Sequence, residues 1–494
     1  MMKRITIAVF LVIVAGSILW ARGSSQTPSG GERTRVYTIM APLIFPEVPP
    51  PDAPVIVELK KLTPHPFELQ FVPTDGYQDR LNISIAAGEL PDAFCVTDPK
   101  HNTFISAING GLIWEVTDAI KSSKTISKNM PQQVLANTNM GGKNYFIPRT
   151  RTMVDTGYSF RKDWLAKLGL KPPTNMDEVY NIMKAFTTQD PDGNGRHDTV
   201  GLITAADSSG IWQLRISATA FGAGNGWVEE NGGLIPVFMT KPYMDTIRFY
   251  KRLYDEKLMN QDFATIRAER ALEILNTEAG GVLIDVIDRP MSRFEVLVKT
   301  KQAQNPNIQL EDLWDFTTDV KSVTGDIRLP AISGYYGGFA FPKTSVKTQA
   351  EFQACFDIFD AFDTDEAKDL VNWGIEGRNF QLQADGRAVA INVDNYAREV
   401  NVFAVIGITA NNIPGKIVGV NRPYRERVDT TNRANIDKGY GIADPTFPLI
   451  SATQTSRGAE LQKIMADAQI QWVMGQIDEA GYMAAIEQWK NSGG

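Results

Sequence analysis

Segment 67–96, FELQFVPTDGYQDRLNISIAAGELPDAFCV, decides the fold class. Its first part, 67–72, alternates apolar and polar side chains, which predicts a strand with one buried face. Residues 77–88 then place apolar side chains at helical spacing and end in glycine, a typical helix terminator. Residues 91–96 are a short apolar run, which predicts a buried strand. Strand, helix and strand in this order form the unit of a parallel α/β sheet.

Outside this segment the same signals recur along the chain. Residues 36–42 predict a strand, and 280–287 and 335–341 are glycine-flanked apolar runs typical of buried strands. Two amphipathic helices are expected near the C-terminus. The sequence therefore predicts a mixed α/β protein with several strands far apart along the chain.

A helix–break–helix signal lies between these strands. Residues 162–168 predict a helix that Gly169 ends. Thr174 and Asp177 are three residues apart, as in a capping box, and precede a second apolar helical stripe over 176–186.

Bulk composition limits the classes of function. The chain has 494 residues, which favours two or three domains, and a formal net charge of −7. No long basic run is present, which argues against nucleic acid as a partner. Of the two cysteines, Cys355 lies on the apolar face of a helical pattern, so a buried free thiol is favoured over a disulfide with Cys95.

The N-terminal residues resemble an export signal. A basic pair at 3–4 precedes the uncharged, largely apolar stretch 5–21, so 1–23 is expected to be a signal peptide and 24–33 a flexible leader. An uncleaved N-terminal anchor is the alternative. The first cysteine is Cys95, so the signal has no lipobox cysteine, and we expect a protein in the periplasm or at the cell surface.

Residues 190–198, DPDGNGRHD, carry oxygen-bearing side chains at positions 1, 3, 5 and 9 of a loop. Gly195 stands at position 6, where an EF-hand loop turns sharply, and Gly201 stands at position 12 instead of the bidentate glutamate. The pattern predicts a structural calcium ion, and the alternative is a metal-free turn rich in Asp, Asn and Gly. The expected ligands are Asp190, Asp192, Asn194 and Asp198 by side chain and Arg196 by its backbone carbonyl.

Motifs of catalysis are missing from the sequence. It contains no Gly-x-Ser-x-Gly, P-loop, His-Glu-x-x-His or Cys-x-x-Cys pattern, so no catalytic residues are assigned. Aromatic residues instead stand beside polar, glycine-rich stretches, as at Trp212, Trp227, Trp373 and Tyr335. Flat aromatic faces combined with a few polar groups suit the binding of sugars, although each tryptophan alone is also compatible with core packing.

Seven segments, in this order, resemble the extracellular solute-binding proteins of sugar ABC importers (family 1), in particular the large oligosaccharide-binding branch that includes the alginate-oligosaccharide binders. These segments are 81–92, 142–148, 161–170, 190–195, 253–258, 374–377 and 472–475.

The resemblance implies a two-lobed periplasmic-binding-protein fold of type II, in which ligand binding between the lobes closes them. We expect lobe 1 over 34–153 and 332–396, and lobe 2 over 154–331 and 397–494. The resemblance also implies calcium at the ligands named above, although Thr199 stands where the alginate-binding relatives have a further acidic residue.

The expected function is capture of a carbohydrate and its delivery, by a monomer, to the permease of an ABC importer. The expected lining of the cleft is Asp98, Trp212, Asp285, Tyr335, Glu376 and Phe380. The alternatives are a secreted glycan-acting enzyme and a binding protein for a non-sugar ligand such as a peptide.

Overall fold

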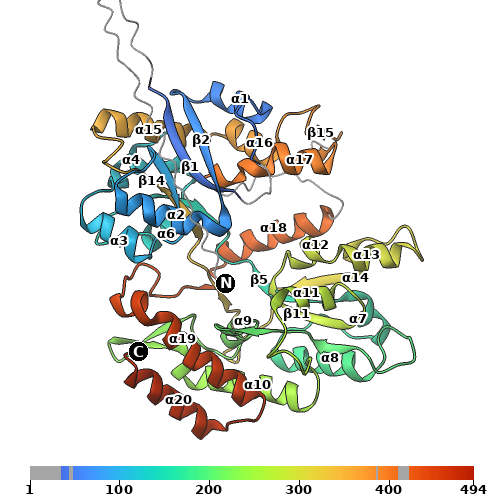
Figure 1. Cartoon of the computed structure of the whole chain (residues 1–494). Coiled ribbons are helices and arrows are strands. Elements are labelled where there is room, and N and C mark those ends of the chain that lie inside the picture. The colour runs from blue at the N-terminus through green and yellow to red at the C-terminus, as the bar shows by residue number, and fades with distance from the viewer. Residues whose placement is uncertain (1–34, 44–47, 385–387, 410–421) are drawn as a thin grey trace, which may run out of the picture. The chain divides into compact units, whose positions relative to one another are not determined.

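A five-stranded sheet organises the first part of the fold (Figure 1). The structure, a computed structural model, describes residues 35–43, 48–384, 388–409 and 422–494. The expected signal peptide (1–23) and leader (24–33) lie outside the described residues. The strand order is β2 (Phe67–Pro73), β1 (Tyr37–Leu43), β3 (Ala93–Val96), β14 (Tyr335–Ala340) and β4 (Ile147–Thr150).

In this sheet β1 runs parallel to β2 and β3, whereas β14 runs antiparallel to β3 and β4. Helices from three stretches of the chain pack around it. They are α1 (Pro54–Leu62), α2 (Thr74–Ala87), α3 (Asn102–Asn109), α4 (Thr117–Ser122), α5 (Ile126–Asn129), α6 (Gln132–Asn137), α15 (Gln349–Phe362), α16 (Asp365–Trp373) and α17 (Val393–Glu399).

The predicted strand–helix–strand unit is confirmed as β2, α2 and β3. Tyr77, Leu81 and Ile85 bury one face of α2, as their spacing requires. Gly88 adopts the left-handed conformation (φ 71°) and ends the helix. The Tyr77 hydroxyl donates a hydrogen bond to the backbone carbonyl of Cys95 (2.7 Å), which ties the helix to β3.

The second sheet has four strands in the order β12 (Trp314–Thr317), β5 (Thr156–Arg161), β11 (Gly280–Val286) and β6 (Val200–Leu202). Only the β11–β6 pair in this sheet is parallel. Its helices are α7 (Lys162–Leu168), α8 (Met176–Thr188), α9 (Leu214–Ala220), α10 (Lys241–Asp255), α11 (Ala268–Leu275), α12 (Arg289–Arg293), α13 (Glu295–Gln302), α14 (Leu310–Leu313), α18 (Arg422–Asp437), α19 (Ala452–Val473) and α20 (Glu479–Asn491).

Short elements complete the fold. Three hairpins are β7 (Ala206–Asp207) with β8 (Gly210–Ile211), β9 (Trp227–Glu230) with β10 (Gly233–Pro236), and β15 (Phe380–Leu382) with β16 (Ala388–Ala390). Two 3₁₀ helices are η1 (Val237–Met239) and η2 (Asn401–Ile406).

The helix–break–helix signal is confirmed, but the predicted capping residue is wrong by one position. Helix α7 ends at Gly169 (φ 66°), as expected. Asn175, rather than Thr174, caps α8, because its side-chain oxygen accepts a hydrogen bond from the backbone N–H of Glu178 (3.0 Å). Glu178 in turn accepts from the backbone N–H of Thr174 (2.7 Å). Asparagine caps helices as well as threonine does, so the three-residue spacing alone placed the cap one residue too early.

Each sheet has its own apolar core. Phenylalanines of β14 and α15 dominate the first core, where the rings of Phe339 and Phe359 lie 4.8 Å apart. Six apolar residues of 400–408 also belong to this core. The second sheet packs against two apolar clusters, and in one of them Trp164 of α7 lies edge-on to Phe186 of α8 (5.2 Å). Cys95 and Cys355 are both buried free thiols, as expected.

Candidate functional site

Chain segments that connect the two sheets have a small core of their own, formed by Val154, Leu329 and Ala331. We call this the connector core. The chain passes from β4 to β5 through 151–155 and from β13 (Leu329–Pro330) to β14 through 331–334. Hydrogen bonds hold these two passages side by side, including one from the Ile332 N–H to the Met153 carbonyl (2.9 Å).

A third segment crosses the connector core without entering either large sheet. This segment, β17 (Gly441–Ile442), pairs in parallel with β13. A Cβ atom at Gly441 would overlap a side-chain methyl of Val154, so glycine leaves room for Val154 in the connector core. Segments distant in sequence therefore meet at one narrow joint, the arrangement through which hinge motions commonly occur.

A cavity of about 940 Å³ lies beside this joint. Its wall combines residues of the β3–α3 loop, the β9–β10 hairpin, the segment after β17, and helices α19 and α20. Its lining combines apolar and aromatic side chains with polar ones: the former include Trp227, Leu234, Phe447, Leu461 and Trp489, and the latter include Asp98, Lys100, His101, Asn102 and Asp444. Such a combination of apolar faces with a few polar groups is typical of small-molecule and sugar sites.

Two tryptophans form part of the aromatic lining of the cavity. Trp227 begins β9 and Trp489 lies near the end of α20, and their ring centroids are 6.4 Å apart at an angle of 55°. Phe238 packs edge-on against Trp489 (5.2 Å) and holds its ring in place. The rings thus sit on two rigid elements, a hairpin and a helix.

The polar lining of the cavity is organised around Lys100. Its ammonium group donates to the Thr446 carbonyl (3.2 Å), which joins the β3–α3 loop to the segment after β17. Burial lowers the pKa of Lys100, and the nearby charges of Asp444 and Asp98 oppose this. Asp444 accepts hydrogen bonds from the backbone N–H (2.8 Å) and hydroxyl (2.7 Å) of Thr446.

Further charges gather between this cavity and the second sheet. Asp155 is in the connecting passage, and burial together with Asp288 and Asp285 raises its pKa to about 6. Asp285 is itself buried; burial raises its pKa, although its ion pair with Arg289 (2.7 Å) lowers it. The positive charge of Arg215 interacts with Asp155, Asp285 and Asp444. Asp155, Asp285 and Arg215 are therefore charged groups of both signs that are largely buried and interact with one another.

The six expected lining residues fall into different places. Asp98 lines the cavity, and burial together with the charge of Asp98 raises the pKa of Tyr335 to about 12, so these two are neighbours. Asp285 belongs to the charged set just described. Trp212 packs against the apolar core under the second sheet. Glu376 is exposed, in a loop beside the β15–β16 hairpin, and is not among the described residues that line the cavity.

Phe380 is buried at the start of β15 and likewise does not line the cavity as described. Sequence reasoning named Trp227 among its aromatic candidates but gave no role to Trp489, His101 or Asp444. Trp489 carried only the signal of an amphipathic helix, which is equally a signal of core packing.

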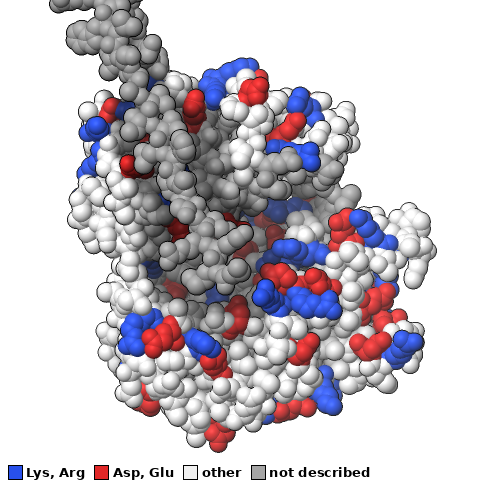
Figure 2. Space-filling view, viewed as in Figure 1, with Lys and Arg blue, Asp and Glu red and all other residues white. Residues whose placement is uncertain are grey.

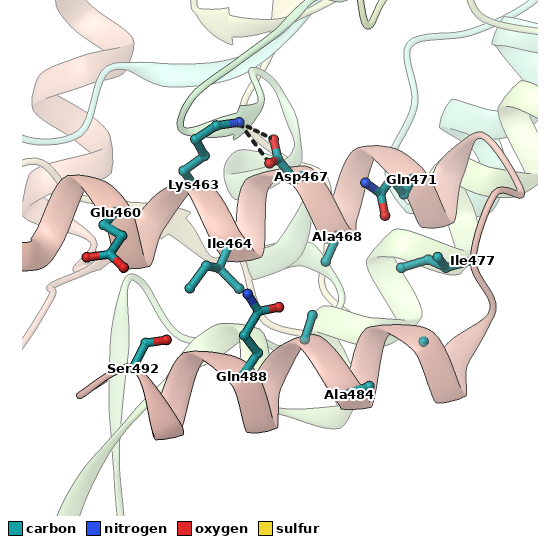
Figure 3. A pocket seen from close by; sticks show the side chains of 12 residues that line it. Glu460, Lys463, Ile464, Asp467, Ala468, Gln471, Ile477, Ala484, Gln488 and Ser492 are labelled. Atoms are coloured by element: carbon teal, nitrogen blue, oxygen red, sulfur yellow. Dashed lines mark hydrogen bonds and ion pairs between the residues drawn. The ribbon is translucent and has the colours of Figure 1, made fainter.

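A second, more open pocket of about 520 Å³ lies between α19 and α20 (Figure 3). Ile464 and Gln488 point toward each other across it. Two of its lining residues, Lys463 and Asp467, form an ion pair on one exposed helix face (2.8 Å). It has no aromatic lining among the described residues, so it suits a sugar less well than the larger cavity.

Among the described residues on the face that Figure 2 shows, no extended patch of one charge sign is seen. In the view of Figure 2, Lys and Arg gather over α12 and α18, but Asp and Glu are interspersed with them. Arg427 pairs with Asp315 and Arg425 with Asp429 (3.0 Å) on this face. The surface therefore adds no argument for a nucleic-acid partner.

The expected calcium loop brings its ligand side chains together after α8. One oxygen of Asp190 accepts from the N–H groups of Gly193 (3.1 Å) and Asn194 (3.2 Å), and the other accepts from Gly195 (3.1 Å). Gly195 has a positive φ of 77°, as the turn requires. The side-chain nitrogen of Asn194 donates to Asp192 (2.7 Å) and Asp198 (3.1 Å).

This arrangement fits a cation only in part. Asp192 and Asp198 meet at the side chain of Asn194, but Asn194 presents its NH₂ group to them, so its amide must rotate before its oxygen can be a ligand. Thr199 is buried, and its hydroxyl donates to the Phe186 carbonyl (2.7 Å), which holds it against the end of α8. Within the described residues no group of three or more His, Cys, Asp or Glu is already placed to hold a metal ion.

Position 12 of the loop is glycine for a structural reason. Gly201 lies in β6 directly against α8, where a Cβ atom would overlap the backbone of Met183. A glutamate there is therefore excluded by packing.

In the part of the chain that the structure describes, no helix is long and apolar enough to span a bilayer.

Comparison with known proteins identifies the chain's relatives. Lipoprotein LipO of Bacillus subtilis is 33% identical over 95% of this chain and 92% of its own length. The polygalacturonan/rhamnogalacturonan-binding protein YtcQ of the same organism is 30% identical, covering 99% of this chain and 96% of its own.

The fold has close counterparts among solved structures. An HMO-binding, ABC-transporter-associated solute-binding protein from Bifidobacterium longum infantis superposes with a TM-score of 0.72, covering 94% of this chain and 96% of its own at 17% identity. The family model described as bacterial extracellular solute-binding protein matches residues 52–376. The chain thus belongs to the family of bacterial extracellular solute-binding proteins, whose members bind solutes for transport and are not enzymes.

Proposed function

We propose that the protein captures an oligosaccharide in the cavity beside the connector core and passes it to the permease of an ABC importer. The single observation that carries this proposal is the wall of the cavity, which combines Trp227 and Trp489 with Asp98, Lys100 and Asp444. Aromatic faces match the C–H surfaces of a sugar ring, and the polar groups match its hydroxyls. The relative YtcQ binds polygalacturonan and rhamnogalacturonan, as its name states, which supports the choice of a saccharide as the solute.

The proposed mechanism is closure about the joint. Each proposed lobe would carry one sheet, and we place residues 397–409 with the first lobe because apolar side chains of 400–408 pack in its core. A solute that contacts both the β3–α3 loop and the β9–β10 hairpin would stabilise the closed form by its differential affinity. The closed form, as a monomer, would then dock on the permease.

Export and calcium are part of the proposal. The apolar stretch 5–21 supports a signal peptide, and the protein would act outside the cytoplasmic membrane. A calcium ion would be held by Asp190, Asp192, Asn194 and Asp198 and the carbonyl of Arg196. It would supply no chemistry beyond fixing the loop between α8 and β6.

Calorimetric titration with trigalacturonic acid, a rhamnogalacturonan tetrasaccharide, kestose and an unrelated nonapeptide tests the function. We expect at least one saccharide to bind with a Kd that is micromolar or lower, and Trp227→Ala to weaken it about tenfold, or ~1.4 kcal/mol. The matched control is Trp114→Ala, which removes a tryptophan stacked on Phe352 in the first core (5.0 Å). Binding of the peptide alone, or equal losses in both variants, would contradict the proposal.

A further inference from the structure

The glycine-rich loop 222–227, GAGNGW, contains a buried polar side chain with an unusual set of partners. Asn225 is only 2% exposed. Its side-chain nitrogen donates to the carbonyls of Ala331 (2.6 Å) and Ile442 (2.9 Å). Its side-chain oxygen accepts from Arg215 (3.0 Å). One amide thus joins three separate segments of the chain.

Two of these partners belong to the joint between the sheets. Ala331 is part of the connector core, and Ile442 ends β17. The Ile442 carbonyl also accepts from the Ala331 N–H (2.9 Å), so Asn225 binds at the point where the two connecting strands pair. A change in the distance between these strands would stretch at least one of the two bonds that Asn225 donates.

The other end of the same loop forms the wall of the cavity. The Trp227 N–H donates to the Asn225 carbonyl (2.8 Å), which fixes the tryptophan two residues from the amide. Between them Gly226 has a positive φ of 71°, and a Cβ atom there would overlap the Asp444 carboxylate. The loop therefore lies directly against Asp444, a second residue of the cavity wall.

We propose that Asn225 is a positioning residue for solute binding. It links the position of Trp227 in the cavity wall to the pairing of β13 with β17. The role in solute binding rests on the proposed function, whereas the link between Trp227 and the connecting strands exists without a solute. When a solute shifts Trp227, the shift is transmitted to the connecting strands through the hydrogen bonds of the Asn225 amide. Arg215 keeps the amide in the orientation that presents both N–H groups to the strands.

A purely structural role makes a different prediction. A buried amide that only satisfies its neighbours would, when removed, destabilise the protein without linking Trp227 to the connectors. Asn260 provides a matched control, because it is also buried (8% exposed) and bonds both backbone groups of Thr204 (2.8 and 3.0 Å). It contacts neither connecting strand through a described hydrogen bond.

Hydrogen exchange of the Ala331 amide, followed by mass spectrometry, tests the coupling without a solute. We expect Trp227→Ala to speed this exchange at least threefold in the wild-type background and to have no further effect in Asn225→Ala. Asn260→Ala should leave it unchanged. Additive effects of the two substitutions, or no effect of Trp227→Ala, would overturn the proposal.

Asn225→Asp covers the case in which Asn225→Ala folds poorly. It keeps the size and the contact with Arg215 but donates neither bond, so it should behave like Asn225→Ala. With trigalacturonic acid and kestose we expect Kd to rise at least tenfold in both Asn225 variants and less than twofold in Asn260→Ala. A wild-type protein that binds neither saccharide would count against the proposed function, while the exchange experiment would still decide the role of Asn225.

Discussion

Asp155 should make the stability of this protein fall as the pH rises from about 4 to about 6. Its carboxyl is in the passage between the sheets, where burial and the charges of Asp288 and Asp285 raise its pKa to about 6. In the unfolded chain its pKa returns to the ordinary value of about 3.9. Between these two values the folded state binds more protons than the unfolded state, so stability decreases with rising pH.

The magnitude follows from the same two values. A difference of about two pKa units corresponds to roughly 3 kcal/mol, since one unit is worth about 1.4 kcal/mol. Asp155→Asn stays neutral at every pH and should therefore match the wild type near pH 4. Above pH 7 it should be more stable than the wild type by up to about 3 kcal/mol, with partial solvent screening reducing this value.

Urea denaturation at pH 4, 5, 6, 7 and 8, followed by tryptophan fluorescence, measures this difference. Asp118→Asn is the matched control, because the Asp118 side chain is 97% exposed. It should show no comparable dependence on pH. If Asp155→Asn differs from the wild type by the same amount at pH 4 and pH 8, or is less stable at pH 8, the assigned environment of Asp155 is refuted.

Three further predictions concern the rest of the fold. Excess EDTA should lower the melting temperature of the wild type but not of Asp192→Ala, and an unchanged wild-type melt with no metal detected would exclude a structural calcium ion. Gly201→Ala should lower the free energy of unfolding by ~2–4 kcal/mol in urea, because its Cβ overlaps the Met183 backbone, and a loss below ~0.5 kcal/mol would contradict this packing. Cys95 and Cys355 should react with a thiol reagent only after denaturation, and rapid labelling of the native protein would disprove their burial.

The sequence was sufficient for elements whose signals are local. The β2–α2–β3 unit follows from alternation, helical spacing and a terminal glycine, all of which act within one segment. The backbone turn of the loop 190–198 is similar, because Gly193 and Gly195 take positive φ values there, whereas the calcium ligands named in this loop stay a prediction. Family membership also follows from segments in a fixed order. These features needed no knowledge of which distant residues meet.

Only the tertiary structure decided the site, because its wall combines chain segments that are hundreds of residues apart. Asp98, Trp227 and Trp489 share one cavity, although nothing in their local sequence links them. Phe380 had the same kind of local signal and is instead buried away from the described lining. The role of Asn225 likewise depends on the meeting of β13 and β17. Local patterns fix periodicity and caps, whereas the choice between a core residue and a cavity residue depends on which surfaces the packed sheets and helices leave uncovered.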